Sequence, residues 1–337
     1  DKYQNPQRIV DRYRYFCQTH AFLGESFPNL NIDFGPGSLA SYLGSEIGFK
    51  EDTVWFNKCL DGWDGVPKLT FDPENKHLQL AKDCQALAGD DFYVDMPDLM
   101  ENIDVLASLR GAQDILFDLL DEPEMIGERI QEVTDIYYEY YDRFYDVIKD
   151  EEGGNAYTVF QIWGPGRTVK LQCDFSAMMS PEDFRKYIQP SLRSQSENVD
   201  HVLYHLDGPA AIKHMDALME IEGIDALQWT SGDAGPDGTL PDWDVIYDKA
   251  IAALTVEVPE TAVGKEIVIT FADGISLAEN DLAGRCYAML DKAQIPYNLK
   301  SDIQAIVEKM GKDGVATLAT MNLSPALFGA VLEILNA

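Results

Sequence analysis

Short apolar, β-branched runs alternate with longer amphipathic segments along most of the chain. This alternation is typical of strand–helix units around a parallel sheet, because buried parallel strands are short and apolar while the covering helices have one apolar face. Eight segments have the strand pattern: residues 30–34, 53–56, 92–96, 156–163, 201–206, 225–230, 266–271 and 314–319.

The helical segments between these runs have recognisable starts. Segment 122–149 repeats aromatic and aliphatic residues at helical spacing and has Pro123 near its beginning. At Ser180 the sequence supplies a capping serine, a proline at the first helical position and two acids in the first turn. Repeated strand, loop and capped helix predict a single (β/α)8 (TIM) barrel domain over residues 1–337.

A doubly wound open sheet is the second candidate for the fold. No GxGxxG turn follows the first predicted strand, which argues against a dinucleotide-binding fold. The chain begins within a predicted helix, so we expect a native N-terminal segment to precede it.

Composition narrows the classes of partner. The formal net charge is −32, from 58 acidic and 26 basic residues, and such a surface repels nucleic acid and anionic lipid. No apolar run reaches the ~18 residues of a membrane-spanning helix. The five cysteines are widely spaced without a CxxC pair, which predicts a reducing, cytoplasmic compartment rather than a disulfide framework.

Chemistry in a barrel is carried by the loops after the strands. The richest such segment contains Gln161, Trp163, Arg167, Gln172 and Asp174. Arg167 is suited to hold a carboxylate through two hydrogen bonds, and Asp174 to act as an acid or base. A structural Arg–Asp brace at the top of the barrel explains the same two residues equally well.

His205 and Asp207 lie two residues apart at the end of a predicted strand, so their side chains point the same way. An imidazole and a carboxylate together suit Zn²⁺ or another divalent ion when a third ligand is present. We expect that ligand to be Asp174 or a residue near Asn322. The alternative is a hydrogen-bonded His–Asp pair without a metal.

Two more strand ends contribute candidate pocket residues. Trp229 precedes a Gly-containing loop and forms either a pocket wall or an apolar cap, and Asp98 follows another strand and adds a carboxylate. No GxxxxGK[ST], GxSxG or HExxH motif occurs, which argues against a P-loop kinase, a serine hydrolase of that type and a zincin. We predict that one cavity at the carboxyl ends of the strands is faced by Trp163, Arg167, Asp174, His205, Asp207 and Trp229.

Five segments have a distinctive sequence: NIDFGPGSLASYL (31–43), DMPDLMENIDVLASLRG (95–111), WGPGRTVKLQCDFSAMMSP (163–181), YHLDGP (204–209) and IDALQWTSG (224–232). Together they resemble the uroporphyrinogen decarboxylase superfamily, most closely its uroporphyrinogen decarboxylase-like branch. The resemblance covers about residues 5–250 and fades after residue 255. It implies one TIM barrel with its site at the strand ends.

The resemblance implies one of two chemistries. Cofactor-free decarboxylation of a tetrapyrrole uses an Arg-rich N-terminal motif, which this sequence lacks. Methyl transfer instead depends on a corrinoid carried by a partner protein and on a zinc ion held by a His-x-Cys pair and a further Cys near the last strand. Here the pair is His205-Leu206-Asp207, and residues 319–322 contain no Cys. Without the two thiolates, the expected site has hard oxygen and nitrogen ligands and a lower preference for thiophilic metal chemistry.

Three hypotheses follow. The first is a corrinoid-linked methyltransferase or demethylase acting on a small molecule, in which His205 and Asp207 hold a metal or polarise the substrate. The second is a decarboxylase or lyase, in which Arg167 anchors a carboxylated small molecule and Asp174 or Asp207 delivers a proton. The third is a barrel that binds a ligand without catalysis.

Overall fold

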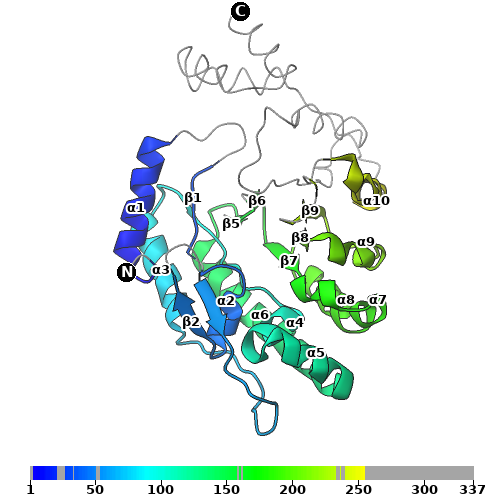
Figure 1. Ribbon diagram of the computed structural model, residues 1–337. Helices are drawn as coiled ribbons and strands as arrows, with labels where there is room; N and C mark the ends of the chain where they lie inside the picture. The colour runs from blue at the N-terminus through cyan, green and yellow to red at the C-terminus, as the bar shows by residue number, and fades with distance from the viewer. Residues whose placement is uncertain are drawn as a thin grey trace, which may run out of the picture.

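The computed structural model describes residues 3–20, 27–32, 34–50, 54–157, 159–160, 162–232, 236 and 240–254 (Figure 1). Their strands are β1 (Asn29–Leu30), β2 (Glu46–Phe49), β3 (Val54–Asn57), β4 (Tyr93–Val94), β5 (Asn155–Tyr157), β6 (Ile162–Gly164), β7 (Thr168–Gln172), β8 (His201–Asp207) and β9 (Ala226–Thr230). Their helices are α1 (Pro6–Thr19), α2 (Ser38–Tyr42), α3 (Lys76–Ala88), α4 (Asn102–Arg110), α5 (Ala112–Asp121), α6 (Pro123–Ile148), α7 (Pro181–Asp183), α8 (Gln189–Ser196), α9 (Met215–Met219) and α10 (Asp244–Leu254), with 3-10 turns η1 (Asp174–Met178), η3 (Pro209–His214) and η4 (Pro241–Trp243) and a π-helical turn η2 (Phe184–Ile188).

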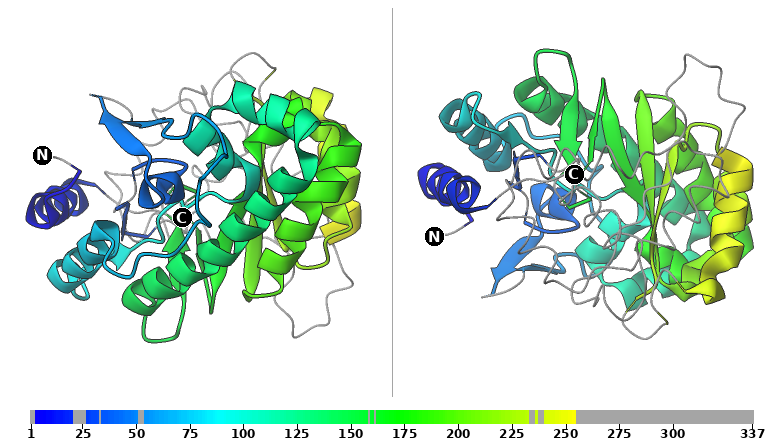
Figure 2. Two further views of the ribbon diagram at one scale, coloured as in Figure 1. Left: turned by 90° about the horizontal axis from the view of Figure 1, so that it is seen from below. Right: turned by 90° about the horizontal axis from the view of Figure 1, so that it is seen from above.

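Six strands lie side by side in the order β1, β4, β5, β7, β8, β9. β1 pairs in parallel with β4, and β7, β8 and β9 form a parallel sheet. β5 lies between these two groups, since the Met96 N–H donates to the Ala156 carbonyl at 2.8 Å and the Asn155 amide donates to the Thr168 carbonyl at 3.0 Å. The helices cover the outer side of this row (Figure 2). The predicted pairing of segments 201–206 and 225–230 is confirmed.

Two strand predictions need correction, and one strand was not predicted. Segment 53–56 overlaps β3, but β3 pairs antiparallel with β2 in a hairpin and is not part of a strand–helix unit. Segment 156–163 is not one strand, because β5 turns back antiparallel into β6. β7 was not predicted, because Thr168, Lys170 and Gln172 make this alternating strand resemble a polar loop.

Closure of the barrel stays a prediction. Among the described strands the hydrogen-bonded ladders form separate short sheets without a closed ring. The segments expected to supply the last two strands, 266–271 and 314–319, lie outside the described residues, as does the region near Asn322.

β7, β8 and β9 have two distinct faces. The register pairs Lys170 with Leu203 and Leu203 with Ala226, so alternate residues of the three strands share a face. One face is apolar and packs in the main hydrophobic core under the helices, with Val169, Leu171, Val202, Tyr204, Leu206 and Leu227. The opposite, inner face is mostly polar and consists of Thr168, Lys170, Gln172, His201, His205, Asp207, Gln228 and Thr230, with Leu203 and Ala226 between them.

The two helix starts predicted from the sequence, at Pro123 and after Ser180, are confirmed. α6 starts at Pro123, where a missing N–H costs nothing, and buries Ile130, Tyr137, Tyr141 and Phe144 at helical spacing. The Ser180 side chain accepts a hydrogen bond from the Asp183 N–H at 3.0 Å, as expected of a helix cap. None of the helices described here is both long and apolar enough to cross a membrane.

His77 is an aromatic-packed histidine in α3, remote from the polar inner face of the strands. Its ring is buried and lies 4.7 Å from the rings of both Phe34 and Tyr42. Burial, with a smaller contribution from Lys76, lowers the pKa of His77 from 6.5 to about 4. The folded protein therefore holds this ring in its neutral form at neutral pH.

We expect His77 to make folding stability sensitive to mild acid. Because the unfolded chain binds this proton at higher pH than the folded chain, the contribution of His77 is complete above about pH 6.5. It is lost as the pH falls to about 4, with a loss of about 3 kcal/mol. Urea unfolding of the wild type and His77→Phe between these pH values measures it. The variant should lose less stability on acidification, and identical pH profiles would contradict the assignment.

Candidate functional site

Three potential metal ligands meet at the carboxyl ends of β7 and β8. Asp207 is the last residue of β8, His205 precedes it by two residues, and Asp174 begins η1 just after β7. One ligand atom from each of the three lies within 4.8 Å of the others. Asp174 and Asp207 are exposed, whereas His205 is half-buried. His205 and Asp207 therefore point into one volume, as their spacing predicts, and Asp174 lies in the same group.

The ring of His205 is oriented by Gln228 on the neighbouring strand. The Gln228 amide nitrogen donates to the Trp229 carbonyl at 3.1 Å and to Thr230 Oγ1 at 2.9 Å, so the amide oxygen is the acceptor for His205 Nδ1. His205 therefore carries its proton on Nδ1 and presents the Nε2 lone pair. Phe160 packs against the same ring, with centroids 5.1 Å apart.

Asp174 is held from two directions. Gln172 Nε2 donates to Asp174 Oδ2 at 2.9 Å. The buried carboxylate of Asp104 accepts hydrogen bonds from the backbone N–H groups of Asp174 and Phe175 at 2.8 and 2.7 Å, and so fixes the start of η1. The position of Asp174 thus depends on polar groups of both β7 and α4.

A buried cation lies directly beneath this group. The Lys170 ammonium forms an ion pair with Asp98 Oδ1 at 2.5 Å and a short hydrogen bond to the Gln172 side-chain oxygen. Lys170 is 2% exposed and Glu101 is completely buried beside it. Because Gln172 also donates to Asp174, one hydrogen-bonded chain runs from Asp98 through Lys170 and Gln172 to Asp174.

The backbone around Glu101 is strained. Met100 and Asn102, on either side of it, have φ of +54° and +48°, which residues other than glycine rarely adopt. The strain is held in place by the Asn102 amide, which donates to the Gln172 carbonyl at 3.1 Å, and by a short hydrogen bond from the Gln172 N–H to Glu101. This conformation directs a buried carboxylate toward Lys170.

The charges in the site affect one another. Burial, followed by the positive charge of Lys170, lowers the pKa of His205, so its imidazole is neutral at neutral pH. Although Asp174 keeps some exposed surface, the surrounding protein desolvates its carboxyl group and raises its pKa; the Asp207 carboxylate adds to this effect and Lys170 opposes it. Burial and the charge of Asp174 raise the pKa of Asp104 to about 7. A bound cation would relieve this crowding of carboxylates.

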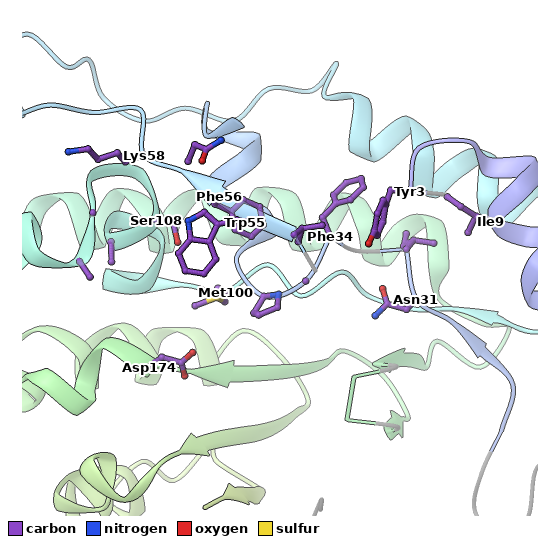
Figure 3. Close-up of a pocket in the computed structure, with 18 of the residues that line it drawn as sticks. Tyr3, Ile9, Asn31, Phe34, Trp55, Phe56, Lys58, Met100, Ser108 and Asp174 are labelled. Carbon is purple, nitrogen blue, oxygen red and sulfur yellow. The ribbon is translucent and has the colours of Figure 1, made fainter. Parts of the chain in front are cut away.

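A cavity of about 1070 Å³ opens beside Asp174. Figure 3 shows Asp174 on one side of it and the β2–β3 hairpin with Trp55 on the other. Its size is that of a pocket for a small organic molecule. Asp174 is the residue through which the cavity and the ligand cluster meet.

Arg167 and Trp163 are not in this site, contrary to the prediction. Arg167 immediately precedes β7 and lies near the amino end of β8, about 13 Å along the sheet from His205. Trp163 lies beside the start of β5, where its indole N–H donates to Asp150 Oδ2 at 2.8 Å. Arg167 was misplaced because the strand that begins after it was not recognised, and Trp163 because the turn between β5 and β6 was not recognised.

Trp229 is also outside the site, for a different reason. It belongs to the apolar face of β9, where it packs in the main core with its ring 5.1 Å from that of Trp243. Its neighbour Gln228 occupies the inner face instead. Asp98 and Gln172 belong to the buried network beneath the site, and Gln161 lies outside the described residues.

Arg167 forms a brace at the amino ends of the strands. Its guanidinium pairs with Asp142 and lies 4.9 and 5.2 Å from the ring centroids of Tyr141 and Tyr145, while the backbone N–H of Arg167 donates to the Asp200 carboxylate. We expect Arg167→Gln to reduce the free energy of unfolding by about 1 kcal/mol. Zinc affinity, measured by calorimetry, should be unchanged. A large loss of zinc affinity in a stably folded variant would show that Arg167 contributes to the metal site, and would contradict its assignment as a structural brace.

Four polar residues of the site were not predicted from the sequence: Glu101, Asp104, Lys170 and Gln228. Lys170 and Gln228 could have been identified from strand alternation, since Lys170 and Gln172 lie two residues apart, as do Gln228 and Thr230. Nothing comparable marks Glu101 and Asp104, because they reach the site through a strained loop and a helix start.

The chain was compared with models of known protein families and with curated proteins, and neither comparison gives a match.

Proposed function

We propose that this chain is an enzyme of the uroporphyrinogen decarboxylase-like superfamily that acts on a small organic molecule at a divalent-metal site. The observation that carries the proposal is the convergence of Asp174, His205 and Asp207 within 4.8 Å at the strand ends. The four described cysteines are free, which supports a reducing, cytoplasmic location.

The donor atoms fit a divalent cation. One neutral imidazole and two carboxylates form a hard ligand set that suits Zn²⁺, Mn²⁺ or Fe²⁺ and leaves positions open for a substrate. The hydrogen bond from His205 Nδ1 to Gln228 is the outer contact that metal-binding histidines usually make. When bound, the ion would polarise an oxygen or nitrogen of the substrate.

The remaining residues orient the donors and exclude water. Gln228 keeps the Nε2 lone pair of His205 directed toward the two carboxylates, and Phe160 shields the ring. Gln172, itself bound to Lys170, holds one oxygen of Asp174 and leaves the other available. The half-buried imidazole is neutral at neutral pH, as a metal ligand must be.

Corrinoid-linked methyl transfer or demethylation is the reaction class that we favour, with the corrinoid on a partner protein. The choice of this reaction class depends on the sequence resemblance alone. The decarboxylase or lyase alternative relied on Arg167 as the carboxylate anchor, and Arg167 lies at the other end of the strands. Without thiolate ligands, the site is better suited to substrates with oxygen or nitrogen donors than to thiols.

Metal content tests the proposal. Protein purified without chelator, incubated with Zn²⁺ and desalted should retain about one zinc per chain by elemental analysis, and Asp207→Asn should retain much less. His201→Ala is the matched control, since it removes a histidine from the opposite end of the same strand. Wild-type protein that retains no more zinc than Asp207→Asn would overturn the proposal.

The reaction class has its own test. Metal-loaded protein is mixed with methylcobalamin and a set of amine, phenol and thiol acceptors, and the cobalamin absorbance is followed. We expect an amine or phenol to cause loss of the methylcobalamin spectrum faster than a thiol does. Absence of any protein-dependent change would overturn methyl transfer while leaving the metal site intact.

A further inference from the structure

The cavity beside Asp174 has an unusual lining. Four aromatic rings contribute to it, from Tyr3, Phe34, Trp55 and Phe56, and Met100 adds an apolar floor. Rings and a thioether in one cavity offer flat apolar surface and favourable stacking rather than a dense set of hydrogen-bond donors.

Trp55 is the most informative of these residues. Its side chain is 66% exposed although it lies on β3, in a hairpin whose Val54 and Phe56 are half-buried. In Figure 3 its ring projects into the gap between the hairpin and Met100, with Asp174 on the far side. An exposed indole at a cavity wall is a large apolar surface for a ligand to cover.

The charges around the cavity differ from those of the whole chain. The described lining residues include Arg12 and Lys58 but only one acid, Asp174, whereas the whole chain has 58 acidic and 26 basic residues. Lys58 is paired with Asp114 at 3.3 Å, a residue outside the lining. Arg12 has no ion-pair partner among the described residues, so its guanidinium is available to an anionic group.

We infer that the cavity binds a planar aromatic molecule with an acidic substituent, whose ring stacks on Trp55 and whose acid is attracted to Arg12. As the substrate class of the proposed enzyme, this inference rests on the proposed function. It places the ring between Trp55 and Met100 and brings the end of the molecule nearest Asp174 to the ligand cluster.

The test uses two fluorescent probes with the same ring system. Anilinonaphthalene sulfonate carries an acid and phenylnaphthylamine does not. The sulfonate should bind the wild type with a single affinity, and Trp55→Ala should raise its dissociation constant about tenfold or more, because the stacking surface is lost. Trp55→Phe keeps a ring and should stay within about threefold of the wild type. Phe117→Ala removes an aromatic that is 56% exposed but lies outside the lining, and should change nothing.

The contribution of charge is measured with Arg12→Gln. The wild type should bind the sulfonate more tightly than the neutral probe, and Arg12→Gln should remove that preference. Equal affinity of Trp55→Ala and wild type, or equal effects of Trp55→Ala and Phe117→Ala, would overturn the aromatic assignment. Equal affinity of the wild type for both probes would overturn the inference that the ligand carries an acidic group.

Zinc binding by the same variants separates this inference from the proposed function. Trp55→Ala should bind zinc as the wild type does, since Trp55 is not a ligand. If zinc binds normally but the probe affinity does not depend on Trp55, the inferred class of ligand is wrong and the proposed metal site is unaffected. Probe binding that depends on Trp55 in a protein that binds no zinc refutes the metal-dependent function and leaves the cavity assignment standing.

Discussion

Replacing His205 by alanine should abolish activity and weaken zinc binding by roughly 100-fold or more, because it removes the only nitrogen ligand of a three-residue site. Calorimetric titration with Zn²⁺ measures the affinity. The fold should be retained, since the ring is half-buried and its main partner, Gln228, keeps two other hydrogen bonds.

His201→Ala is the matched control for this experiment. His201 begins β8, is half-buried like His205, and lies four residues away along the strand. Its removal should leave zinc affinity within about twofold of the wild type. If His205→Ala folds normally and binds zinc as well as His201→Ala does, the His205–Asp207 pair is structural and the metal site is wrong.

Replacing Lys170 by methionine should cost roughly 3–5 kcal/mol of the free energy of unfolding, because it leaves the carboxylate of Asp98 buried without its cation, next to the buried carboxyl group of Glu101. Burial alone would lower the pKa of Lys170, but Asp98 and Glu101 raise it above its usual value, so the ammonium stays charged. Urea unfolding followed by circular dichroism measures the loss.

Two companion variants separate charge from packing. Adding Asp98→Asn and Glu101→Gln to Lys170→Met should recover part of the lost stability, since no uncompensated charge is then buried. Lys149→Met removes a lysine from a surface ion pair with Asp146 and should have no measurable effect. A triple variant less stable than Lys170→Met would show that the residues contribute through shape rather than charge.

Sequence periodicity predicted the parts of the fold with strong local patterns. α6 has a long apolar stripe, β8 contains the uninterrupted apolar run Val202–Tyr204, and β9 begins with Ala226 and Leu227, so each could be located from its own pattern. β7 could not, because half of its side chains form a polar inner face and so break the apolar run that marks a buried strand.

The site could be predicted only in part, for reasons of register. His205 and Asp207 converge because of spacing within one strand, which the sequence contains. Whether Gln228 or Trp229 shares their face depends on how β9 pairs with β8, which a single sequence does not reveal. Arg167 was assigned to the wrong end because its position depends on where β7 begins.

The most direct test of the metal site is anomalous diffraction at the zinc absorption edge from crystals soaked in Zn²⁺. We predict one strong peak at about 2.0–2.2 Å from His205 Nε2 and from one carboxylate oxygen each of Asp174 and Asp207. A data set in which zinc occupies surface carboxylates but leaves this position empty, with the three side chains turned apart, would contradict the account.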